Sequence, residues 1–372
     1  MPAPVPQRFR TGVSLHSHTY YSRESFDFIR RAGLRTPVVS SLIRAAELRY
    51  QRRHGKCLEL GRAWWTPPLG PGEVLRGELD QLRRLDLGGL VAITDHDDLQ
   101  APLDLRREHP AAPLSLEWSV PLGAALLHLG IYNLPSAQAS DIFLAMQRYR
   151  DTPDIHTLPE ILTAAGSDPG ALVVLNHPMW NLGGLGRERH DAVLRTLLCR
   201  AGQFIHALEL NGMRRWQKNQ SVLHLSYACN QLVIAGGDRH GCEPNAILNL
   251  TNAESFTEFV YQVRRERFSH LLFMPQYTDP YALRILQVLL DATREHPSIG
   301  SGSWDERVFH PDHAGVIRPL SELWDAPPFY VRYFFSLVRL LEVAPVRKAV
   351  LALAKPQQEM SLALGERQEV AP

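Results

Sequence analysis

The chain has 372 residues, of which 45% are hydrophobic and 21% are charged, and its formal net charge is +1. This composition is typical of a soluble globular protein that forms one large domain with an appendage, or two domains. The balanced charge indicates no general affinity for nucleic acid or membranes. No window approaches about 18 uncharged apolar residues, which argues against a transmembrane segment.

The cysteines and the N-terminus predict a cytoplasmic protein. The four cysteines lie far apart, and no Cys-x-x-Cys pair is present. This spacing favours reduced thiols over a disulfide framework or a cysteine zinc site. Residues 1–10 lack the apolar core of a signal peptide. Only four of the 40 basic residues are lysines, so any anion-binding group is expected to be an arginine.

The first predicted strand covers residues 11–14 and is followed by His16 and His18. Side chains alternate along an extended chain, so the two imidazoles point to the same side. Two neutral imidazoles in this arrangement form half of a site for a divalent transition metal. The pair is weak evidence alone, because most histidines lie on the surface or in a satisfied core position.

Residues 36–82 interrupt this pattern. A helix is predicted over 41–53, and the proline- and glycine-rich stretch 62–72 predicts a shaped loop. The segment is either a lid over the site or a surface insertion with its own small core. Trp64 and Trp65 would stack on a substrate ring in the first case and anchor that core in the second.

Strands and helices then alternate. Strands are predicted over 88–94, 114–120, 124–131, 171–176, 204–211 and 232–235, and helices over 138–150, 157–165, 187–200 and 214–229. This order predicts parallel strands wrapped by helices, either open or closed into a barrel. In such folds the carboxyl ends of the strands carry the active site.

Metal-ligand residue types lie at those strand ends. The candidates are His16, His18, Glu24, His96, Glu117, His128, His177, Asp238 and His240. Taken singly, His128 is equally well a core histidine, and Asp238 a turn residue. These alternatives do not explain why nearly all the candidates follow apolar strands. Six imidazoles and three carboxylates suit two or three divalent metals (Zn, Mn or Fe) that share Glu117 and Asp238.

In order, the motifs resemble those of the PHP (polymerase and histidinol phosphatase) superfamily. They are His-Ser-His-Thr at 16–19, Thr-Asp-His-Asp at 94–97, Glu117 with His-Leu-Gly at 128–130, Asn-His-Pro at 176–178, Glu-Leu-Asn at 209–211 and Gly-Gly-Asp-Arg-His at 236–240. The resemblance covers about 11–270 and implies a distorted (β/α)7 barrel with a di- or trinuclear metal site. It implies a PHP barrel over 1–275, with 36–82 as a helical insertion, and a helical C-terminal extension over 276–372.

The resemblance also implies how the ligands are shared. One metal would take His16, His18, Glu117 and Asp238; a second His96, His240 and, most plausibly, Glu24; a third Glu117, His128 and His177. The long gap across 36–82, the extension, and Arg239 in place of a small residue depart from the family pattern.

The implied activity is hydrolysis of a phosphate ester by a metal-activated hydroxide. Arg239 and Arg214 are the candidate bidentate phosphate partners, with solvated surface arginines as the alternative. Asp97 is expected to orient His96 or the nucleophile. A small phosphorylated metabolite or nucleotide is favoured over a nucleic acid end, because no basic and aromatic track is present.

Two other function classes stay open. The first alternative to a phosphoesterase is a non-catalytic, regulatory metal-binding module that acts through its extension. The second is a metal-dependent hydrolase of a non-phosphate bond. In the extension, a helix is predicted over 281–294, followed by a polar loop to about 312. The apolar stretch 328–343, with arginines at 332 and 339, predicts either a helix packed on the barrel or an interfacial or oligomer contact.

Overall fold

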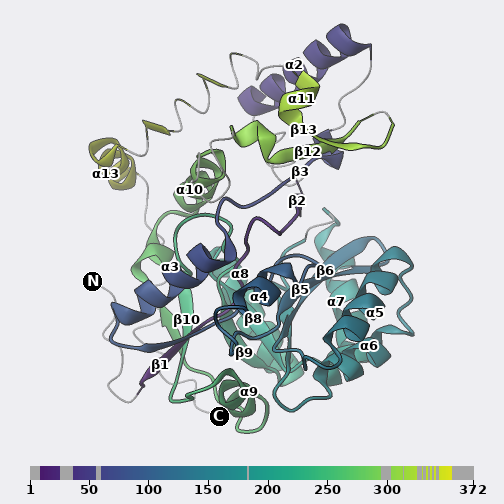
Figure 1. Ribbon diagram of the computed structural model, residues 1–372, viewed down its shortest axis with the longest axis vertical. Coiled ribbons are helices and arrows are strands. Elements are labelled where there is room, and N and C mark those ends of the chain that lie inside the picture. The colour runs from purple at the N-terminus through teal and green to yellow at the C-terminus, as the bar shows by residue number, and fades with distance from the viewer. Residues whose placement is uncertain are drawn as a thin grey trace.

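The computed structural model describes residues 9–25, 37–55, 60–181, 184–294, 303–312, 314–324, 329, 332–333, 336, 339–340 and 343–353. It shows a mixed α/β fold in which the strands form three sheets (Figure 1). Across these ranges, every helix is too short or too polar to cross a membrane. The apolar stretch 328–343 lies mostly outside the described residues.

The largest sheet has five strands in sequence order. They are β5 (Leu116–Leu122), β6 (Ala125–Tyr132), β7 (Leu172–Asn176), β8 (Ala207–Asn211) and β9 (Leu232–Gly236). β7, β8 and β9 are parallel, whereas β5, β6 and β7 pair antiparallel. β7 and β8 are buried along their whole length, as expected for apolar strands covered on both faces. Side chains of helices α5, α6 and α7 pack against this sheet in the main hydrophobic core.

A four-stranded sheet lies beside it, in the order β11-β10-β1-β4. Its strands are β1 (Thr11–Ser14), β4 (Gly88–Val91), β10 (Ile247–Thr251) and β11 (Leu271–Phe273). β1 pairs parallel with β4 and antiparallel with β10. Single bridges join the two larger sheets at Ser17–Arg239 and at His96–Glu117. The ends of β1, β4 and β9 therefore meet near the start of β5.

The third sheet, in the order β13-β12-β3-β2, combines distant parts of the chain. Its strands are β2 (Glu24–Ser25), β3 (Trp64–Trp65), β12 (Val308–Pro311) and β13 (Ile317–Pro319). Figure 1 shows it, with α2 and α11, above the two larger sheets. The insertion and the C-terminal extension thus share one sheet.

Helices connect and cover the strands. They are α2 (Pro37–His54), α3 (Pro71–Arg83), α4 (Gln100–Leu105), α5 (Ala139–Asp151), α6 (Leu158–Gly166), α7 (Arg187–Ala201), α8 (Trp216–Cys229), α9 (Phe256–Arg264), α10 (Tyr281–Thr293), α11 (Leu320–Trp324) and α13 (Ala344–Leu353). Short 3-10 turns are η1 (Leu60–Arg62), η2 (Gly202–Phe204), η3 (Pro275–Thr278) and η5 (Trp304–Glu306).

The expectation of parallel strands throughout is wrong, and a closed (β/α)7 barrel is not established. The strands divide among separate sheets, and β5 and β6 form a hairpin that turns at Gly123, whose φ is +60°. Helix α3 also begins inside the predicted loop 62–72. Pro71 suits the first turn of a helix, and Glu73 accepts a hydrogen bond from the Gly70 N–H at 2.9 Å, which closes the N-terminus.

Candidate metal centre

All nine side chains predicted as metal ligands lie in one centre, where the two larger sheets meet. They come from the ends of β1, β4, β7 and β9, from β5 and β6, and from the edge strand β2. Donor atoms of eight of them form three groups, within each of which the atoms lie within 4.8 Å of one another, and His177 adjoins the third group through its contact with Glu117. The groups share residues, so they form one continuous centre.

Three of these residues have left-handed backbone conformations. The φ angles are +66° at His16, +29° at His177 and +57° at Asp238. Each residue directly follows a buried strand or lies two positions beyond it. A positive φ is uncommon for a non-glycine residue and clusters at functional sites, where the surrounding structure holds it. The sharp turn after each strand directs the side chain into the centre.

The first group contains His16, His18, Glu117 and Asp238. Glu117 Oε2 lies 3.1 Å from His16 Nε2 and 3.4 Å from His18 Nε2. Asp238 Oδ1 lies 3.6 and 3.7 Å from the same nitrogens. Four donors at about 2.0–2.2 Å from a tetrahedral ion lie about 3.3–3.6 Å apart. The spacing therefore fits a divalent metal.

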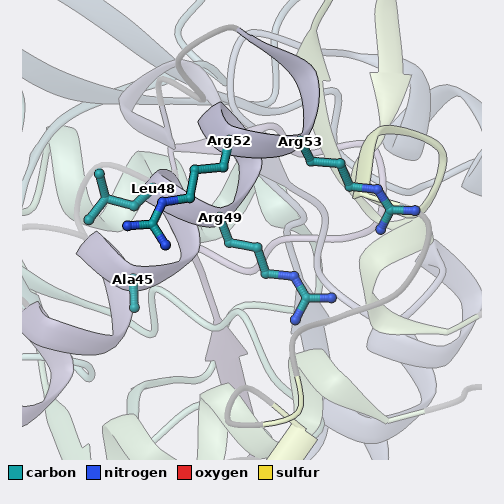
Figure 2. Close-up of a pocket in the computed structure, with 5 residues that line it drawn as sticks. All are labelled: Ala45, Leu48, Arg49, Arg52 and Arg53. Atoms are coloured by element: carbon teal, nitrogen blue, oxygen red, sulfur yellow. The ribbon is translucent and has the colours of Figure 1, made fainter.

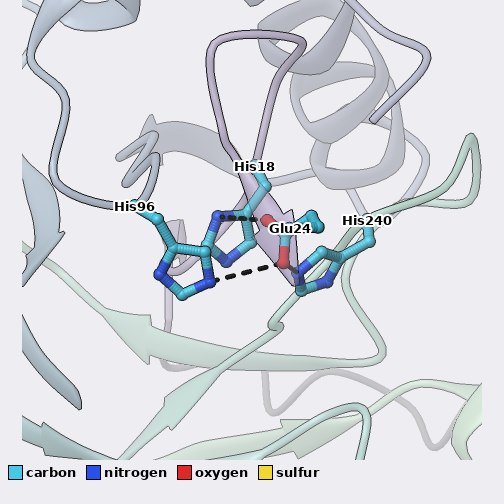
Figure 3. Close-up of side chains that lie close together, drawn as sticks. All are labelled: His18, Glu24, His96 and His240. Atoms are coloured by element: carbon cyan, nitrogen blue, oxygen red, sulfur yellow. Dashed lines mark ion pairs between the residues drawn. The ribbon is translucent and has the colours of Figure 1, made fainter. Parts of the chain in front are cut away.

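The second group surrounds Glu24, which lies on β2 (Figure 3). Glu24 Oε2 lies 3.0 Å from His240 Nε2 and 3.4 Å from His96 Nε2. Its Oε1 lies 3.8 Å from His18 Nδ1. The carboxylate is placed among three imidazoles, where the sequence alone gave only a loose assignment.

The third group forms on the other oxygen of Glu117. Its Oε1 lies 3.0 Å from His177 Nε2 and 3.2 Å from His128 Nδ1, while Oε2 lies 3.2 Å from His96 Nδ1. His96 thus presents one ring nitrogen to Glu24 and the other to Glu117. Glu117 lies at the junction of the first and third groups, as a bridging carboxylate must.

Several buried nitrogen and oxygen atoms that could bind a metal have no hydrogen-bond partner. These atoms are His16 Nε2, His18 Nε2, His96 Nδ1, Glu117 Oε2 and His128 Nδ1. Leaving a buried polar atom unsatisfied costs about 1–3 kcal/mol. The unpaired atoms face one another in the first and third ligand groups, so cations held in these two groups would satisfy all five. The residues present fit divalent metal ions.

Other side chains fix the orientation of the imidazoles. Glu209, which was not predicted as a site residue, accepts a hydrogen bond from His16 Nδ1 and, at 2.8 Å, from the His177 N–H. Ser22 contacts His18 Nδ1 at 3.1 Å and donates to Glu24 Oε1 at 2.6 Å. Such partners set which ring nitrogen faces the metal. The sequence signal for Glu209 was its place in the Glu-Leu-Asn motif.

The electrostatics of the imidazoles differ. Burial would lower the pKa of His16, but Glu117 and Glu209 outweigh it and raise that pKa well above its ordinary value. Burial would also lower the pKa of His96, but Glu24 and Glu117 outweigh it and raise that pKa to about 10. Burial and the nearby His240 lower the pKa of His18 to about 3. A metal must therefore displace protons from His16 and His96 but not from His18.

The carboxylates are held ionised, as metal ligands must be. Burial alone would raise the pKa of Asp238, but the Arg214 guanidinium and the nearby imidazoles hold it well below its usual range. Burial would likewise raise the pKa of Glu24, but His240 and His96 outweigh it and lower that pKa. The imidazoles near Glu117 lower its pKa in the same way. The three carboxylates are thus in the ionised form that binds cations.

Arg214 lies in the centre and Arg239 does not contribute its guanidinium to it. Arg214 Nη2 lies 2.7 Å from Asp238 Oδ2, and its guanidinium stacks 3.7 Å above the Trp180 ring. Arg239 is buried, and it donates to the carbonyls of Glu243 and Cys242 at 2.5 and 2.7 Å. Two of its three guanidinium nitrogens thus hold the turn at 242–243, and the third, Nη1, lies 3.6 Å from Glu78, which belongs to no ligand group. The phosphate role of Arg239 stays a prediction.

Asp97 occupies a structural position beside His96. Its Oδ1 accepts from the Ser119 N–H at 2.8 Å, and Oδ2 pairs with Arg150 Nη1 at 2.8 Å. Its positive φ of +52° turns the chain after His96 toward β5. These contacts fix the loop to β5, whereas the sequence predicted that Asp97 orients His96 or the nucleophile, and that role stays a prediction.

The insertion packs on the C-terminal extension above the centre. Trp64 stacks on Phe309 at 4.3 Å, and Trp65 belongs to a small hydrophobic core with Val308 and Leu320. The Trp65 ring centroid also lies 6.3 Å from that of His240. The tryptophans therefore anchor a local core, one edge of which borders the metal centre.

A separate pocket lies on α2 of the insertion (Figure 2). It is lined by Ala45, Leu48, Arg49, Arg52 and Arg53. Its arginines extend from the last turns of the helix, where positive side chains interact favourably with the helix dipole. The pocket shares no residue with the metal centre.

No protein-family model and no curated protein matches the chain. Solved structures with overall similarity include PsfC from Pseudomonas syringae PB-5123, at 14% identity and a TM-score of 0.46 over 76% of this chain and 97% of that one. A protein from Bifidobacterium adolescentis described as a metal-dependent phosphoesterase matches at 19% identity and 0.32, over 53% and 92%. An amidohydrolase from Chromobacterium violaceum matches at 14% and 0.32, over 67% and 95%. These similarities are low, so the function proposed below rests on this chain's own residues.

Proposed function

We propose that the chain is a metal-dependent phosphoesterase of the PHP type, built on a distorted (β/α)7 barrel. The observation that carries the proposal is the set of unpaired buried donors that converge between the ligand groups, with a guanidinium beside them. The two single bridges support the barrel, because one connects β4 to β5 through His96 and Glu117, and the other connects the segments that directly follow β1 and β9.

The ligand groups support two or three metal ions. His16, His18, Glu117 and Asp238 would hold the first ion. The second and third would be held, respectively, by His96 and His240 with Glu24, and by His128 and His177 with Glu117. When bound, such ions lower the pKa of a coordinated water and withdraw charge from phosphoryl oxygens.

Arg214 is the residue best placed to bind the substrate. Its Nη2 lies beside Asp238 and its Nη1 donates to the Met213 carbonyl at 3.1 Å, whereas its Nε is buried without a hydrogen-bond partner. A guanidinium presents paired N–H groups that match two phosphate oxygens. Arg214 would therefore orient the phosphoryl group against the metals, while Glu209 keeps His16 in the orientation that binds metal.

The exposure of the centre favours a small substrate. The side chains of His96 and His240 are 13% and 15% exposed, and the other ligands are less exposed. Only a small group, such as a phosphate on a metabolite or nucleotide, reaches ligands buried to this extent. We therefore favour a small phosphate ester over a nucleic acid end.

Metal content and phosphatase activity of the full-length chain test this function. Protein purified without chelator should contain two to three equivalents of Zn, Mn or Fe by inductively coupled plasma mass spectrometry. The His16→Ala/His18→Ala variant should lose metal and the hydrolysis of small phosphate esters. Wild type that stays folded but binds no added metal would refute the proposal. Bound metal without phosphatase activity would favour a regulatory module or, with activity on amide substrates, a hydrolase of a non-phosphate bond.

A further inference from the structure

The loop that carries Arg214 is held by residues far along the chain. The carbonyl oxygen of Arg214 accepts a hydrogen bond from the Tyr277 hydroxyl at 3.1 Å and from Arg284 Nη2 at 3.2 Å. Arg284 Nη1 donates to the Gly212 carbonyl at 2.6 Å. A guanidinium can be placed only as accurately as its own backbone, so these contacts determine where the Arg214 side chain begins.

Arg284 is an unusual residue for a purely structural contact. It is 6% exposed, and none of the ion pairs among the described residues joins it to a carboxylate. Its guanidinium lies 4.8 Å from the Tyr277 ring centroid, and burial lowers its pKa. Burying a charge that forms no ion pair is costly, and an apolar side chain would fill the same volume at a lower cost. What only an arginine supplies is a planar set of donors that fixes two carbonyls at once.

Tyr277 extends this support to the ligand Asp238. Its fully buried hydroxyl accepts from Asn219 Nδ2 at 2.7 Å, and Asn219 also bonds the backbone N–H and carbonyl of Asn211. Asn211 Nδ2 in turn donates to Asp238 Oδ2 at 3.2 Å. The loop 211–214 is therefore fixed at both ends from η3, α8 and α10.

We infer that Tyr277 and Arg284 are positioning residues for the phosphate-binding guanidinium of Arg214, an inference that rests on the proposed function. They touch neither the substrate nor the ligand groups, and they act through the backbone of 212–214. The segment after residue 275 therefore sets affinity for the phosphoryl group, while the metals are held by residues that precede it.

Binding of inorganic phosphate to the metal-loaded, full-length protein tests the inference. Isothermal titration calorimetry would compare wild type with Arg284→Met, Arg214→Met and the double variant, with metal content measured on each sample. We expect unchanged metal content in Arg284→Met and, from the loss of a charge-assisted hydrogen bond, about tenfold weaker phosphate binding in each single variant. The double variant should bind no more weakly than Arg214→Met, because Arg284 acts through Arg214.

Arg264 provides a matched control. Its guanidinium also donates to backbone carbonyls, those of Asp168 and Ala171 at 2.6 and 2.7 Å, but at the opposite end of β7. Arg264→Met should lower stability and leave phosphate affinity unchanged. An equal loss of phosphate affinity in Arg264→Met and Arg284→Met would overturn the inference, since general destabilisation would then explain both.

Wild-type phosphate affinity in Arg284→Met, or a loss that adds to that of Arg214→Met, would also overturn it. If Arg284→Met does not fold, Tyr277→Phe removes one hydroxyl and should weaken phosphate binding several-fold; unchanged binding there rejects the inference. Metal-loaded wild type that binds no phosphate would reject the proposed function together with the inference. Phosphate binding that depends on Arg214 but not on Arg284 or Tyr277 would reject the inference alone.

Discussion

Replacing Glu209 with glutamine is expected to weaken metal binding without unfolding the protein. One carboxylate oxygen of Glu209 accepts from His16 Nδ1, and the other accepts from the His177 N–H at 2.8 Å and from Asn211 Nδ2 at 2.9 Å. A glutamine keeps the shape but places an NH₂ group against one of these donors. There is no room to rotate away, since even a Cβ at Gly236 would lie 1.6 Å from Glu209 Oε1.

The size of the effect follows from the role of Glu209 in orienting His16. Outer-shell partners of this kind are worth about 10–100-fold in metal affinity, equivalent to about 1.4–2.7 kcal/mol. Competition against a chromogenic chelator would measure the loss in Glu209→Gln, with circular dichroism to confirm folding. Glu78→Gln is the matched control, because Glu78 is buried and accepts from the Asn245 N–H at 3.0 Å but belongs to no ligand group. Unchanged metal affinity in Glu209→Gln would refute the assigned role.

Two further predictions concern protons. Because the pKa of His96 is raised to about 10 in the metal-free protein, metal binding at neutral pH should release protons, and affinity should keep rising with pH across the neutral range. Calorimetry in buffers of different ionisation enthalpy measures this release; none at pH 7 would contradict the prediction. The second concerns His206, whose Nδ1 accepts the Val173 N–H at 2.9 Å and whose pKa is lowered to about 4 by burial and by Arg264. As the pH falls, His206 takes up a proton in the unfolded chain before it does so in the folded protein. The free energy of unfolding therefore decreases from about pH 6.5 down to about pH 4, by at most about 2 kcal/mol between pH 7 and 5. Urea unfolding should show a smaller loss over that interval in His206→Gln than in wild type, and equal losses would exclude His206 as the cause.

The convergence of the candidate ligands could be predicted from the sequence, whereas the sheet directions could not. The candidate ligands were visible because nearly all of them follow or lie within a short apolar run, and strand ends are where polar side chains gather in such folds. Glu24, on the two-residue strand β2, is the exception. The rule of alternating strands and helices fails for β5 and β6, which are separated by two residues. A connection this short permits only an antiparallel hairpin, and Gly123 with its positive φ is the residue that such a turn favours.

The positions of the arginines depend on long-range contacts that no local pattern carries. Arg239 follows a predicted ligand in the chain, and this adjacency suggested a phosphate partner. Its burial depends instead on the turn at 242–243 and on α3, whose Glu78 lies 3.6 Å from Arg239 Nη1. Arg214 lies just beyond β8, and its place beside Asp238 depends on contacts with residues more than 60 positions later. Tertiary contacts, rather than sequence spacing, thus separate the two arginines.

Glu24 shows why the insertion and the extension belong to the metal centre. It lies on β2, a strand of two residues, and so short a strand has little stability of its own. Glu24 pairs with Trp65 of the insertion, which pairs in turn with Val308 of the extension. The second ligand group therefore requires that 64–65 and 308–311 be in place, although the two segments lie more than 200 residues apart in sequence. A centre assembled from both ends of the chain couples metal binding to folding of the whole protein.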